Sequence, residues 1–538
     1  MKLRLPINGL SSNTLILLVS LFLVAACNQA FFTHTLKIYP LESGKTVYLA
    51  SLTVSFFAVN ALLLSLISFG RATKPVLIIF LLLASLAAYF MDSYGVVLSD
   101  EMLRNAVQTN PTEARDLITS KLFAYLFFLG VLPASIIAKI PLRWRGWRRE
   151  LAFRLGLIAG LGIVIIALVM ASSSFYASFL REHKSLRSYA NPAYFTYSAL
   201  RYADQTFSTQ SAQTLTILGA DARKAGTDTH RHLTVLVVGE TARADRFSIN
   251  GYERETTPQL KAAQVMNFSN YWACGTSTAV SVPCMFSMAG MNDFDLKTAA
   301  SRENLLDVLQ HAGVNVLWLD NNSDSKGVAA RSTYEEFKSP PTNPLCDEEC
   351  RDEGMLPRLQ AFVDSHPTGD LFVVLHQMGN HGPAYFKRYP ASFAKFTPVC
   401  QSNDLSQCTR EEISNAYDNA ILYTDHFLGK TIEQLKRNDK NFQTALFYLS
   451  DHGESLGENG IYLHGLPRAI APDNQLHVPA IIWLGSGFNN VDRTALHKKS
   501  GDHFTHDNVV HTVLGLMGIE TKLYRPKLDI LNGTRQAK

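Results

Sequence analysis

The chain has little net charge for its length, and no internal repeat or low-complexity tract is apparent. Its 50 Lys and Arg residues nearly balance 46 Asp and Glu residues, which leaves a formal charge of +4 over 538 residues. Nucleic-acid-binding domains carry a clear basic excess, so this composition gives no support for a nucleic-acid partner. A chain of this length is long enough for two or more domains.

Charged residues are especially scarce in five apolar runs in the first third of the chain. These runs lie roughly at 14–32, 47–69, 75–97, 122–140 and 155–175. Each is close to the ~20 residues that a membrane-spanning helix needs. Basic residues gather before the first run and in two of the connections: Lys2, Arg4, Arg71, Lys74, Arg143, Arg145, Arg148, Arg149 and Arg154. Because excess Lys and Arg stay cytoplasmic, we expect the N-terminus inside and everything beyond about residue 176 outside.

Cysteine is also scarce in the apolar third, where only Cys27 occurs. It ends a "VAAC" segment that resembles a lipoprotein cleavage box, but four further spans favour a retained helix with an ordinary thiol. The other six cysteines fall in the exported part as three close couples: Cys274 and Cys284, Cys346 and Cys350, Cys400 and Cys408. Such couples in an oxidising compartment indicate local disulfides; a zinc-binding cysteine cluster is the alternative.

Beyond residue 231 the pattern changes to short apolar runs that alternate with helical stretches. Runs at 232–238, 314–319, 371–376, 444–449 and 478–484 have the β-branched and aromatic content of buried parallel strands. Helical stretches include 302–312 and 410–438. The sequence therefore predicts a membrane domain of five transmembrane helices (1–175) and an α/β domain with a mostly parallel sheet (231–538). The aromatic-rich connector, 176–230, is either an amphipathic interfacial element or a packed linker.

Polar residues follow four of the predicted strands, which indicates one shared site. Glu240 follows the first, 320–322 the second, 376–381 the third, and Asp451 with His452 the fourth. Ligand sites in open α/β sheets cluster at the carboxyl ends of strands. Two carboxylates and an imidazole are a ligand set that suits zinc.

A loop rich in hydroxyl groups stands between the first two exported cysteines, in the stretch "GTSTAVSVPC". A hydroxyl close to a metal ion and to a helix N-terminus has a lowered pKa, which makes it a nucleophile for a phosphorus or sulfur ester. The same cluster would also serve as a simple helix N-cap. Chemistry alone does not settle which hydroxyl attacks among Thr276, Ser277, Thr278 and Ser281.

Five motifs in order resemble one known family. They are "VVGETAR", "CGTSTAVSVPCMFS", "NNSDSKG", "HQMGNHGP" and "LSDHGESLGENGIYLHG". The chain is similar to the phosphoethanolamine–lipid A transferases, which include the mobile colistin-resistance enzymes, within the alkaline phosphatase and sulfatase-like superfamily. The family also has five membrane helices followed by a periplasmic domain, so the resemblance covers the whole chain.

The resemblance implies roles for particular residues. Thr278 matches the nucleophile, and it completes a zinc shell with the residues matching Glu240, Asp451 and His452. The expected cofactor is zinc, with one tight site and room for a second ion. Other matched positions contact phosphate, the phosphoethanolamine group or the lipid donor; in this chain they are His381, His464, Ser323, Lys326, Asn105, Thr109 and Glu113.

The function implied by the resemblance is transfer of phosphoethanolamine from phosphatidylethanolamine to lipid A through a phosphoethanolamine-threonine intermediate. The added ammonium would lower surface negative charge and sensitivity to polymyxin-type peptides. We expect a monomer in the bacterial inner membrane, with its catalytic domain in the periplasm. Rival acceptors are a core sugar of lipopolysaccharide and a periplasmic glucan. A membrane-bound sulfatase or phosphatase is the rival activity, but Ala279 and Val280 after Thr278 do not match the sulfatase "C/S-x-P-x-R" motif.

Overall fold

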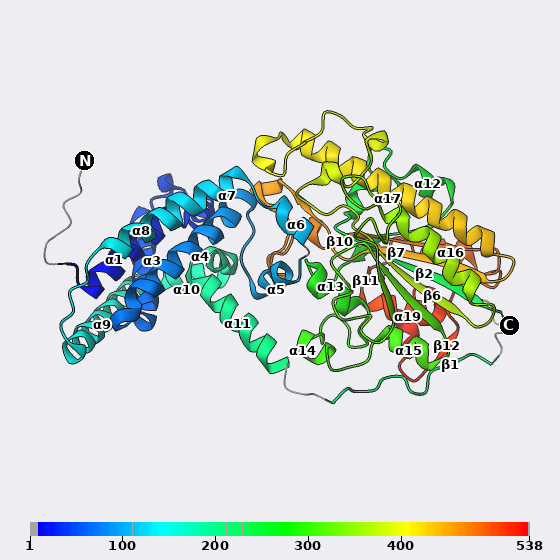
Figure 1. The fold of residues 1–538 in the computed structure, drawn as a ribbon, viewed down its shortest axis with the longest axis horizontal. Helices are drawn as coiled ribbons and strands as arrows, with labels where there is room; N and C mark the ends of the chain where they lie inside the picture. Colours follow the sequence, from blue (N-terminus) through cyan, green and yellow to red (C-terminus); the bar gives the residue numbers. More distant parts are fainter. Residues whose placement is uncertain (1–8, 110, 210–213, 227–229, 536–538) are drawn as a thin grey trace. The chain divides into compact units, whose positions relative to one another are not determined.

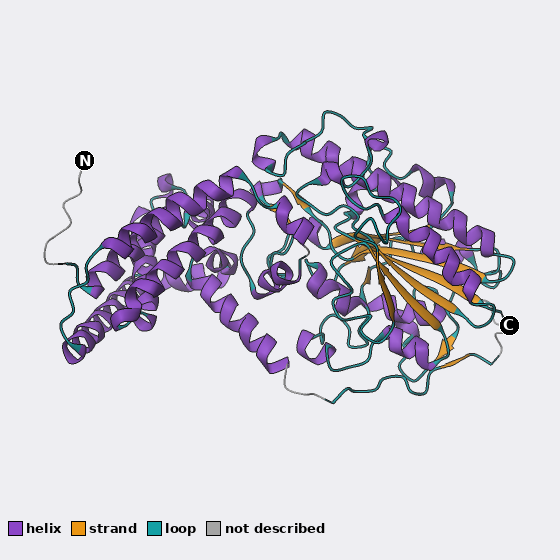
Figure 2. Cartoon of the chain, viewed as in Figure 1, coloured by secondary structure: helices purple, strands orange, loops and turns teal. Residues whose placement is uncertain are grey.

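The structure is a computed structural model that describes residues 9–109, 111–209, 214–226 and 230–535. At 111–113, 174, 177–178, 184 and 207–209 only the backbone is described. The described chain forms two compact units (Figures 1 and 2). Unit 1 comprises 1–103 and 118–203, and unit 2 comprises 104–117 and 204–538. Lys2 and Arg4, on which the predicted orientation partly depends, lie outside the described residues.

Unit 1 is helical, and its long helices match the predicted apolar runs. Four helical stretches are long and apolar enough to cross a membrane: Thr46–Ile67 (α3), Gly70–Tyr94 (mostly α4, Thr73–Tyr94), Ser120–Lys139 (α7, Ser120–Tyr125, to α8, Leu132–Lys139) and Trp147–Ala171 (α9). A fifth span is formed if the bent pair α1 (Ser12–Ala26) and α2 (Gln29–Ile38) is taken as one. The prediction of an N-terminal membrane domain is confirmed.

The first apolar run is broken rather than continuous. The axes of α1 and α2 differ by 57°, and the break falls at Asn28. The amide of Asn28 donates hydrogen bonds to the carbonyl oxygens of Leu23 and Asn191, both at 2.8 Å. A polar side chain that satisfies backbone groups in this way accounts for a break that hydropathy alone does not reveal.

The predicted connector is largely helical. It contains α10 (Ser173–Glu182) and α11 (Ala193–Thr209), separated by a short 3₁₀ segment at Lys184–Tyr189. Tyr189 is buried, and its hydroxyl donates to the carbonyl oxygen of Gly95 at 3.1 Å. This part of the connector, up to residue 203, belongs to unit 1. The predicted domain boundaries and the interfacial role of 176–230 remain predictions.

Unit 2 is built on an eight-stranded sheet in the order β11-β3-β10-β7-β2-β6-β4-β5. The strands are β2 (His232–Gly239), β3 (Met266–Trp272), β4 (Asn315–Asp320), β5 (Thr333–Glu336), β6 (Leu371–His376), β7 (Gln443–Ser450), β10 (His477–Leu484) and β11 (Phe504–Thr505). All five predicted strands are present, and the five strands from β7 to β5 are parallel. The mostly parallel α/β fold is confirmed. Two-stranded sheets join β1 (Arg223–Lys224) to β12 (Ile519–Glu520) and β8 (Ser455–Leu456) to β9 (Tyr462–Leu463).

One predicted strand runs against the parallel block. β10 is antiparallel to both β7 and β3. The chain between β7 and β10 contains only β8, β9 and short 3₁₀ turns. A parallel return needs a crossover that is usually a helix, so β10 comes back alongside β7 in the opposite direction. The apolar composition of 478–484 is the same in either direction.

Helices cover both faces of the sheet (Figure 1). One face packs with α13 (Thr278–Met285), α15 (Leu305–His311) and α19 (Asp507–Leu516) in a single buried apolar cluster. The other face carries α16 (Leu356–Ser365) and α17 (Arg410–Asn438), and α17 has the bounds that the sequence predicts. Thr409 and Glu412 form a capping box at its start. The remaining described α-helices of unit 2 are α12 (Pro258–Ala262), α14 (Leu296–Ala299), α18 (Arg493–Lys498), α6 (Pro111–Asp116) and most of α5 (Asp100–Gln108).

The three predicted disulfides are present. They join Cys274 to Cys284, Cys346 to Cys350 and Cys400 to Cys408. Cys27 has a free, buried thiol. Local pairing of close couples is confirmed, so these thiols do not form a cysteine metal cluster.

Candidate active site

The parallel register places the ends of the central strands side by side. Gly239 at the end of β2 pairs with Ser450 at the end of β7, so Glu240 and Asp451 leave the sheet next to each other. Asp320 at the end of β4 likewise pairs with His376 at the end of β6. The predicted polar clusters therefore meet at one edge of the sheet.

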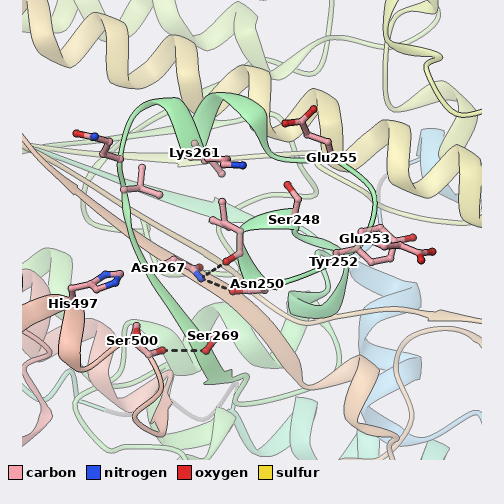
Figure 3. A pocket seen from close by; sticks show the side chains of 14 residues that line it. Ser248, Asn250, Tyr252, Glu253, Glu255, Lys261, Asn267, Ser269, His497 and Ser500 are labelled. Carbon is pink, nitrogen blue, oxygen red and sulfur yellow. Dashed lines mark hydrogen bonds between the residues drawn. The ribbon is translucent and has the colours of Figure 1, made fainter.

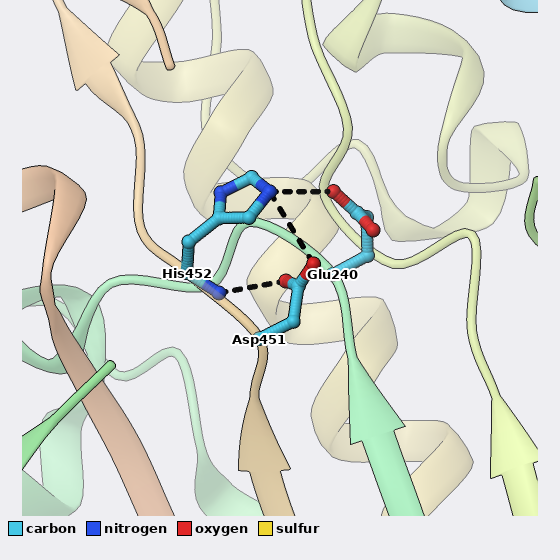
Figure 4. A group of neighbouring side chains, drawn as sticks. All are labelled: Glu240, Asp451 and His452. Atoms are coloured by element: carbon cyan, nitrogen blue, oxygen red, sulfur yellow. Dashed lines mark hydrogen bonds and ion pairs between the residues drawn. The ribbon is translucent and has the colours of Figure 1, made fainter. Parts of the chain in front are cut away.

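Glu240, Asp451 and His452 form a compact, fully buried cluster (Figure 4). Each offers one ligand atom, and these atoms all lie within 4.8 Å of one another. His452 Nε2 is 3.4 Å from Glu240 Oε1 and 3.3 Å from Asp451 Oδ2. This geometry is suited to three protein ligands around one small cation.

The protonation of the cluster also favours a cation. His452 Nδ1 lies 2.9 Å from the carbonyl oxygen of Gly453, which only accepts, so Nδ1 carries the proton and the Nε2 lone pair faces the carboxylates. Burial lowers the pKa of His452 to about 4, so the ring is neutral at pH 7. Burial also raises the pKa of Asp451 to about 6. A lone pair facing two carboxylates is repulsive unless a positive ion lies between them. Among metals, this mixed nitrogen and oxygen set suits zinc.

Thr278 is the first residue of α13, and its side chain contacts the cluster. Its side chain is buried, and Oγ1 donates to Glu240 Oε2 at 3.1 Å and lies 3.4 Å from His452 Nε2. Two other hydroxyls of the loop have backbone partners instead. Thr276 Oγ1 donates to the carbonyl oxygen of Leu466 at 2.6 Å, and Ser281 Oγ accepts from the Gly275 amide at 2.9 Å.

A histidine without any sequence signal anchors the clamped loop. His506 Nδ1 accepts the Cys274 amide hydrogen at 3.0 Å, and Nε2 donates to the carbonyl oxygen of Ser450 at 3.1 Å. It thereby links the start of the loop to the end of β7, next to Asp451. Burial lowers the pKa of His506 to about 3, so the ring is neutral and holds this tautomer. Its distance of more than 200 residues from Cys274 explains why no local pattern identifies it.

Two further predicted histidines lie beside the cluster. The ring centroids of His464 and His452 are 4.3 Å apart, and those of His381 and His464 are 5.2 Å apart. Burial lowers the pKa of His464 to about 4 and that of His381 well below its usual range. Both rings are therefore neutral at pH 7, a state that fits a metal ligand or a hydrogen-bonding partner of phosphate equally well.

His464 is held by a buried carboxyl group that sequence reasoning missed. Its Nδ1 lies 2.7 Å from Glu454 Oε2, and the Tyr385 hydroxyl donates to Glu454 Oε1 at 2.6 Å. Burial raises the pKa of Glu454 to about 8. Glu454 lies within the motif "LSDHGESLGENGIYLHG", but nothing in that motif distinguishes it from polar residues that have no role in a site.

The loop after β4 supplies a second contact to Glu240. Asn322 Nδ2 donates to Glu240 Oε2 at 2.7 Å and to the Gln377 carbonyl oxygen at 2.6 Å, which orients the carboxylate. The predicted residues Ser323 and Lys326 follow on this loop, and Lys326 Nζ donates to the Ser323 carbonyl oxygen at 2.7 Å. Asn322 lies in one of the polar clusters that follow the predicted strands, but its residue type alone indicates no particular role.

Gly379 allows the third loop to pass close to Glu240. Its φ is +53°, which glycine tolerates best, and a Cβ there would lie 2.9 Å from the Glu240 carbonyl oxygen. The "HQMGNHGP" loop can therefore lie directly against the backbone of the predicted metal ligand.

In the chain, the predicted donor-binding residues lie between two membrane spans: Asn105 in α5, Thr109 just after the last residue of α5, and Glu113 in α6. Thr109 Oγ1 donates to the Asn105 carbonyl oxygen at 2.7 Å, which holds these two residues together. Glu113 lies in α6, and its side chain is outside the described residues. Lys326 Nζ donates to the Gln108 carbonyl oxygen at 3.1 Å, which connects this segment to the loop after β4.

A separate polar cavity of about 680 Å³ lies on unit 2 (Figure 3). Its lining includes Asn250, Tyr252, Lys261, Asn267 and His497. None of the predicted site residues lines this cavity, so we assign it no role in the chemistry proposed for Glu240, Asp451 and His452.

Comparison with known proteins places the whole chain in one group. The family model described as "Phosphoethanolamine transferase EptA/EptB" matches residues 56–207, and the model described as "Sulfatase" matches residues 232–519. The chain is 44% identical to phosphatidylethanolamine transferase Mcr-1 of Escherichia coli, over 95% of this chain and 96% of that protein. It is 39% identical to phosphoethanolamine transferase EptA of Escherichia coli K12, over 97% and 96%.

A solved structure shows the same architecture over nearly the whole length. It is the integral membrane protein lipooligosaccharide phosphoethanolamine transferase A from Neisseria meningitidis, with a TM-score of 0.94 and 34% identity. The match covers 98% of this chain and all of that one. The chain therefore belongs to the phosphoethanolamine transferase family, with membrane helices followed by a sulfatase-like α/β domain.

Proposed function

We propose that this protein transfers phosphoethanolamine from phosphatidylethanolamine to lipid A in the bacterial inner membrane. The observation that carries the proposal is the Thr278 hydroxyl, which lies 3.1 Å from Glu240 Oε2 at a buried cluster of metal-ligand type, in a chain of this family. The name of Mcr-1 gives phosphatidylethanolamine as its substrate, and the Neisseria protein is named for lipooligosaccharide. Both support a lipid donor and a lipid A-type acceptor.

The reaction would proceed in two displacements at phosphorus. Thr278 Oγ1 attacks the donor phosphorus, a new oxygen–phosphorus bond forms, and diacylglycerol leaves with a proton. The P–OH oxygen of an acceptor phosphate then attacks the phosphorus of the phosphoethanolamine-threonine. The bond between phosphorus and Thr278 Oγ1 breaks, and the proton released by the acceptor restores the Thr278 hydroxyl. A zinc ion held by Glu240, Asp451, His452 and Thr278 would lower the pKa of that hydroxyl and offset the charge of the phosphoryl oxygens.

The neighbouring residues have the following proposed tasks. Glu240 accepts the hydrogen bond of the Thr278 hydroxyl, which aims the oxygen. His381 and His464 would bind the phosphate, move a proton at the leaving oxygen, or hold a second ion. Ser323 and Lys326 would face the phosphoethanolamine group. Asn105, Thr109 and Glu113 would bind the donor, with the Glu113 carboxylate facing its ammonium.

The same features support the proposed compartment. Three disulfides in unit 2 support an oxidising surrounding, and the helices of unit 1 support a multi-pass membrane protein. We propose that the N-terminus lies in the cytoplasm and the catalytic domain in the periplasm. We also propose that the protein is a monomer. Adding an ammonium group to lipid A would lower its negative charge and weaken its attraction for polymyxin-type peptides.

The test is a pair of mass spectra, one of lipid A and one of the protein. Lipid A from cells with the wild-type protein should gain a phosphoethanolamine group, and cells with Thr278→Ala should show none. Peptides from wild-type protein incubated with phosphatidylethanolamine alone should carry phosphoethanolamine at Thr278. Thr278→Ser should retain partial activity, because it keeps the hydroxyl but frees χ1.

Two results would count against the proposal. An active Thr278→Ala enzyme, or inversion at a chiral phosphorus, would mean direct transfer without the threonine. Unmodified lipid A together with a modified core sugar or glucan would replace the acceptor but keep the chemistry.

A further inference from the structure

The segment 104–117 has an unusual position in the chain. Both flanking segments belong to the membrane-helix unit, yet 104–117 groups with the catalytic unit. It carries all three predicted donor-binding residues. Something in unit 2 must therefore hold this short segment, which is covalently tied to membrane helices at both ends.

The main contact is a buried carboxylate at the end of α6. Asp116 is only 3% exposed. Its Oδ1 accepts hydrogen bonds from Lys387 Nζ at 2.6 Å and Asn403 Nδ2 at 3.2 Å, and its Oδ2 accepts from Arg388 Nη2 at 3.3 Å. Two cations and an amide thus surround one charge that α6 brings to unit 2. Buried charges of this kind are placed with high geometric specificity, because an unpaired one is costly.

Arg388 connects this contact directly to the catalytic centre. Its side chain is 1% exposed. While Nη2 binds Asp116, Nε donates to the His381 carbonyl oxygen at 2.6 Å, and Nη1 pairs with Glu349. His381 is the histidine whose ring lies beside His464. One guanidinium group therefore holds both the donor-binding segment and the backbone of a site histidine.

Two disulfide loops present the remaining groups. Glu349 lies within the loop closed by Cys346 and Cys350, and Asn403 within the loop closed by Cys400 and Cys408. None of these four cysteines belongs to the cluster of Glu240, Asp451 and His452. Their position gives them a task at the Asp116 site instead, since each limits the freedom of a residue in the network.

We propose that Asp116, Lys387, Arg388 and Asn403 form a clasp, and that Asp116 is a positioning residue for the lipid donor. By seating α6, the clasp sets where the donor-binding face of 104–117 stands relative to Thr278 and His381. The hydrogen bond from Lys326 to the Gln108 carbonyl oxygen secures the same segment from the loop after β4. This inference rests on the proposed function, because it assigns the segment to the donor of that reaction.

A mutation in the clasp should affect binding of the lipid donor but not the chemical step at Thr278. In Asp116→Asn the charge is lost, but Arg388 keeps Glu349 and the His381 carbonyl oxygen. Lys387 is a quarter exposed and can turn its ammonium to water. Glu240, Asp451, His452 and Thr278 should then keep their positions, and only the attachment of α6 to unit 2 should weaken. Arg388→Gln should instead disturb both the segment and His381.

The experiment measures full-length enzyme in vesicles of phosphatidylethanolamine, and in parallel on a water-soluble p-nitrophenyl ester of phosphoethanolamine. For Asp116→Asn we expect the KM for phosphatidylethanolamine to rise at least tenfold, with kcat, ester cleavage and zinc content within threefold of wild type. Deuterium uptake in 104–117 should also become faster. Glu520→Gln, which removes an exposed carboxylate paired with Arg223 in the same unit, is the matched control and should change none of these.

The outcomes distinguish the clasp from the proposed function. If wild type cleaves phosphatidylethanolamine but Asp116→Asn keeps its KM, the clasp is wrong and the proposed function stands. Equal loss on both substrates would make Asp116 a general structural residue and would also overturn the clasp. If wild type releases no diacylglycerol, the proposed function fails and the clasp fails with it. Lys387→Gln removes one partner only, and it replaces Asp116→Asn if that variant does not fold.

Discussion

At the scale of single residues, position rather than chemical type sorts the hydroxyls of the clamped loop. Thr276, Thr278 and Ser281 offer similar groups. The hydroxyls of Thr276 and Ser281 bind backbone groups, whereas the Thr278 hydroxyl contacts Glu240 and His452. A nucleophile benefits from being held near its reacting partner before the reaction begins. The geometry therefore favours the residue that the family resemblance indicates.

Glu240, a proposed zinc ligand, and Asn322, which contacts it, should differ in how much zinc affinity they contribute. Asn322→Ala removes only the amide that orients Glu240, so zinc affinity should fall about 10- to 100-fold. Glu240→Gln removes a ligand oxygen charge and should lower zinc affinity further. Zinc bound per chain, measured by elemental analysis across a chelator series, checks both. Asp221→Asn, an exposed carboxylate of the same unit, should behave as wild type, and zinc retention by Glu240→Gln equal to wild type would contradict the ligand assignment.

His506 should make the stability of the protein depend on pH. Its folded-state pKa of about 3 lies below the ordinary value of 6.5, because burial disfavours the charged ring. Above about pH 6.5 the ring is neutral in both states and has no effect. As the pH falls below that value, only the unfolded state gains the proton, so stability falls by about 1.4 kcal/mol per pH unit, or about 2 kcal/mol at pH 5.

His506→Gln should remove the contribution of one titrating group to the slope of the unfolding free energy against pH. The variant should be less stable at pH 7, because it loses contacts to Cys274 and Ser450, but its stability should fall less steeply toward pH 5. The free energy of unfolding of full-length protein at several pH values provides the comparison. Parallel curves for variant and wild type would show that His506 is not the group responsible.

At the scale of elements, the first disulfide joins the segment after β3 to the helix that begins at Thr278. Cys274 follows β3 and Cys284 lies within α13. The Cys274 amide is also bound by His506, which contacts the end of β7. The start of α13 is therefore tied to the strand that leads to Asp451 and His452. The disulfide therefore fixes the backbone at Thr278, the proposed nucleophile, against the proposed metal ligands.

Removing the clamp should lower catalysis more than removing another disulfide of similar loop length. Replacing Cys274 and Cys284 together by Ser should cost about 3 kcal/mol of stability and lower kcat at least tenfold. The pair Cys400 and Cys408, separated by 8 residues rather than 10, is the control and should lose similar stability but keep kcat. Steady-state kinetics and unfolding curves of both variants check this. Equal kcat losses would mean that the clamp has no special relation to Thr278.

At the scale of the whole molecule, the two units differ in composition because they face different surroundings. Many large apolar side chains of unit 1 are exposed, such as Leu21, Ile79, Phe123 and Ile163, which suits a lipid surrounding. Unit 2 buries its apolar residues in a core on the sheet and carries all three disulfides. These features agree with a membrane anchor and a catalytic domain outside the cytoplasm.

Thiol labelling should report this organisation directly. In denatured but unreduced protein purified from cells, we expect one labelled thiol per chain, at Cys27, because the other six cysteines are paired. A reporter that is active only in the periplasm should be active when fused after residue 230. Mass spectrometry of labelled peptides, before and after reduction, provides the count. Labelling at any of the six paired positions, or an inactive reporter, would contradict the assigned compartment.

The features of this protein that depend on short stretches of chain can be predicted from the amino-acid sequence. Hydropathy over about 20 residues located the membrane helices, and runs of apolar residues located β2, β4, β6, β7 and β10. Close spacing was enough to pair the six cysteines correctly. The polar ends of strands indicated a shared site, although the role of Thr278 came from the family resemblance. These features are local, because secondary structure and membrane insertion follow from nearby side chains.

Contacts between residues that are distant in the chain become visible only in the folded molecule. The break at Asn28, the antiparallel direction of β10, the anchor at His506 and the contact of Asp116 with Arg388 have no local signature. Each depends on hydrogen-bond partners that are far away in the chain, and a buried polar group has to find such partners because leaving it unpaired is costly. Apolar pattern shows that a segment is buried. It does not show which polar groups burial brings together.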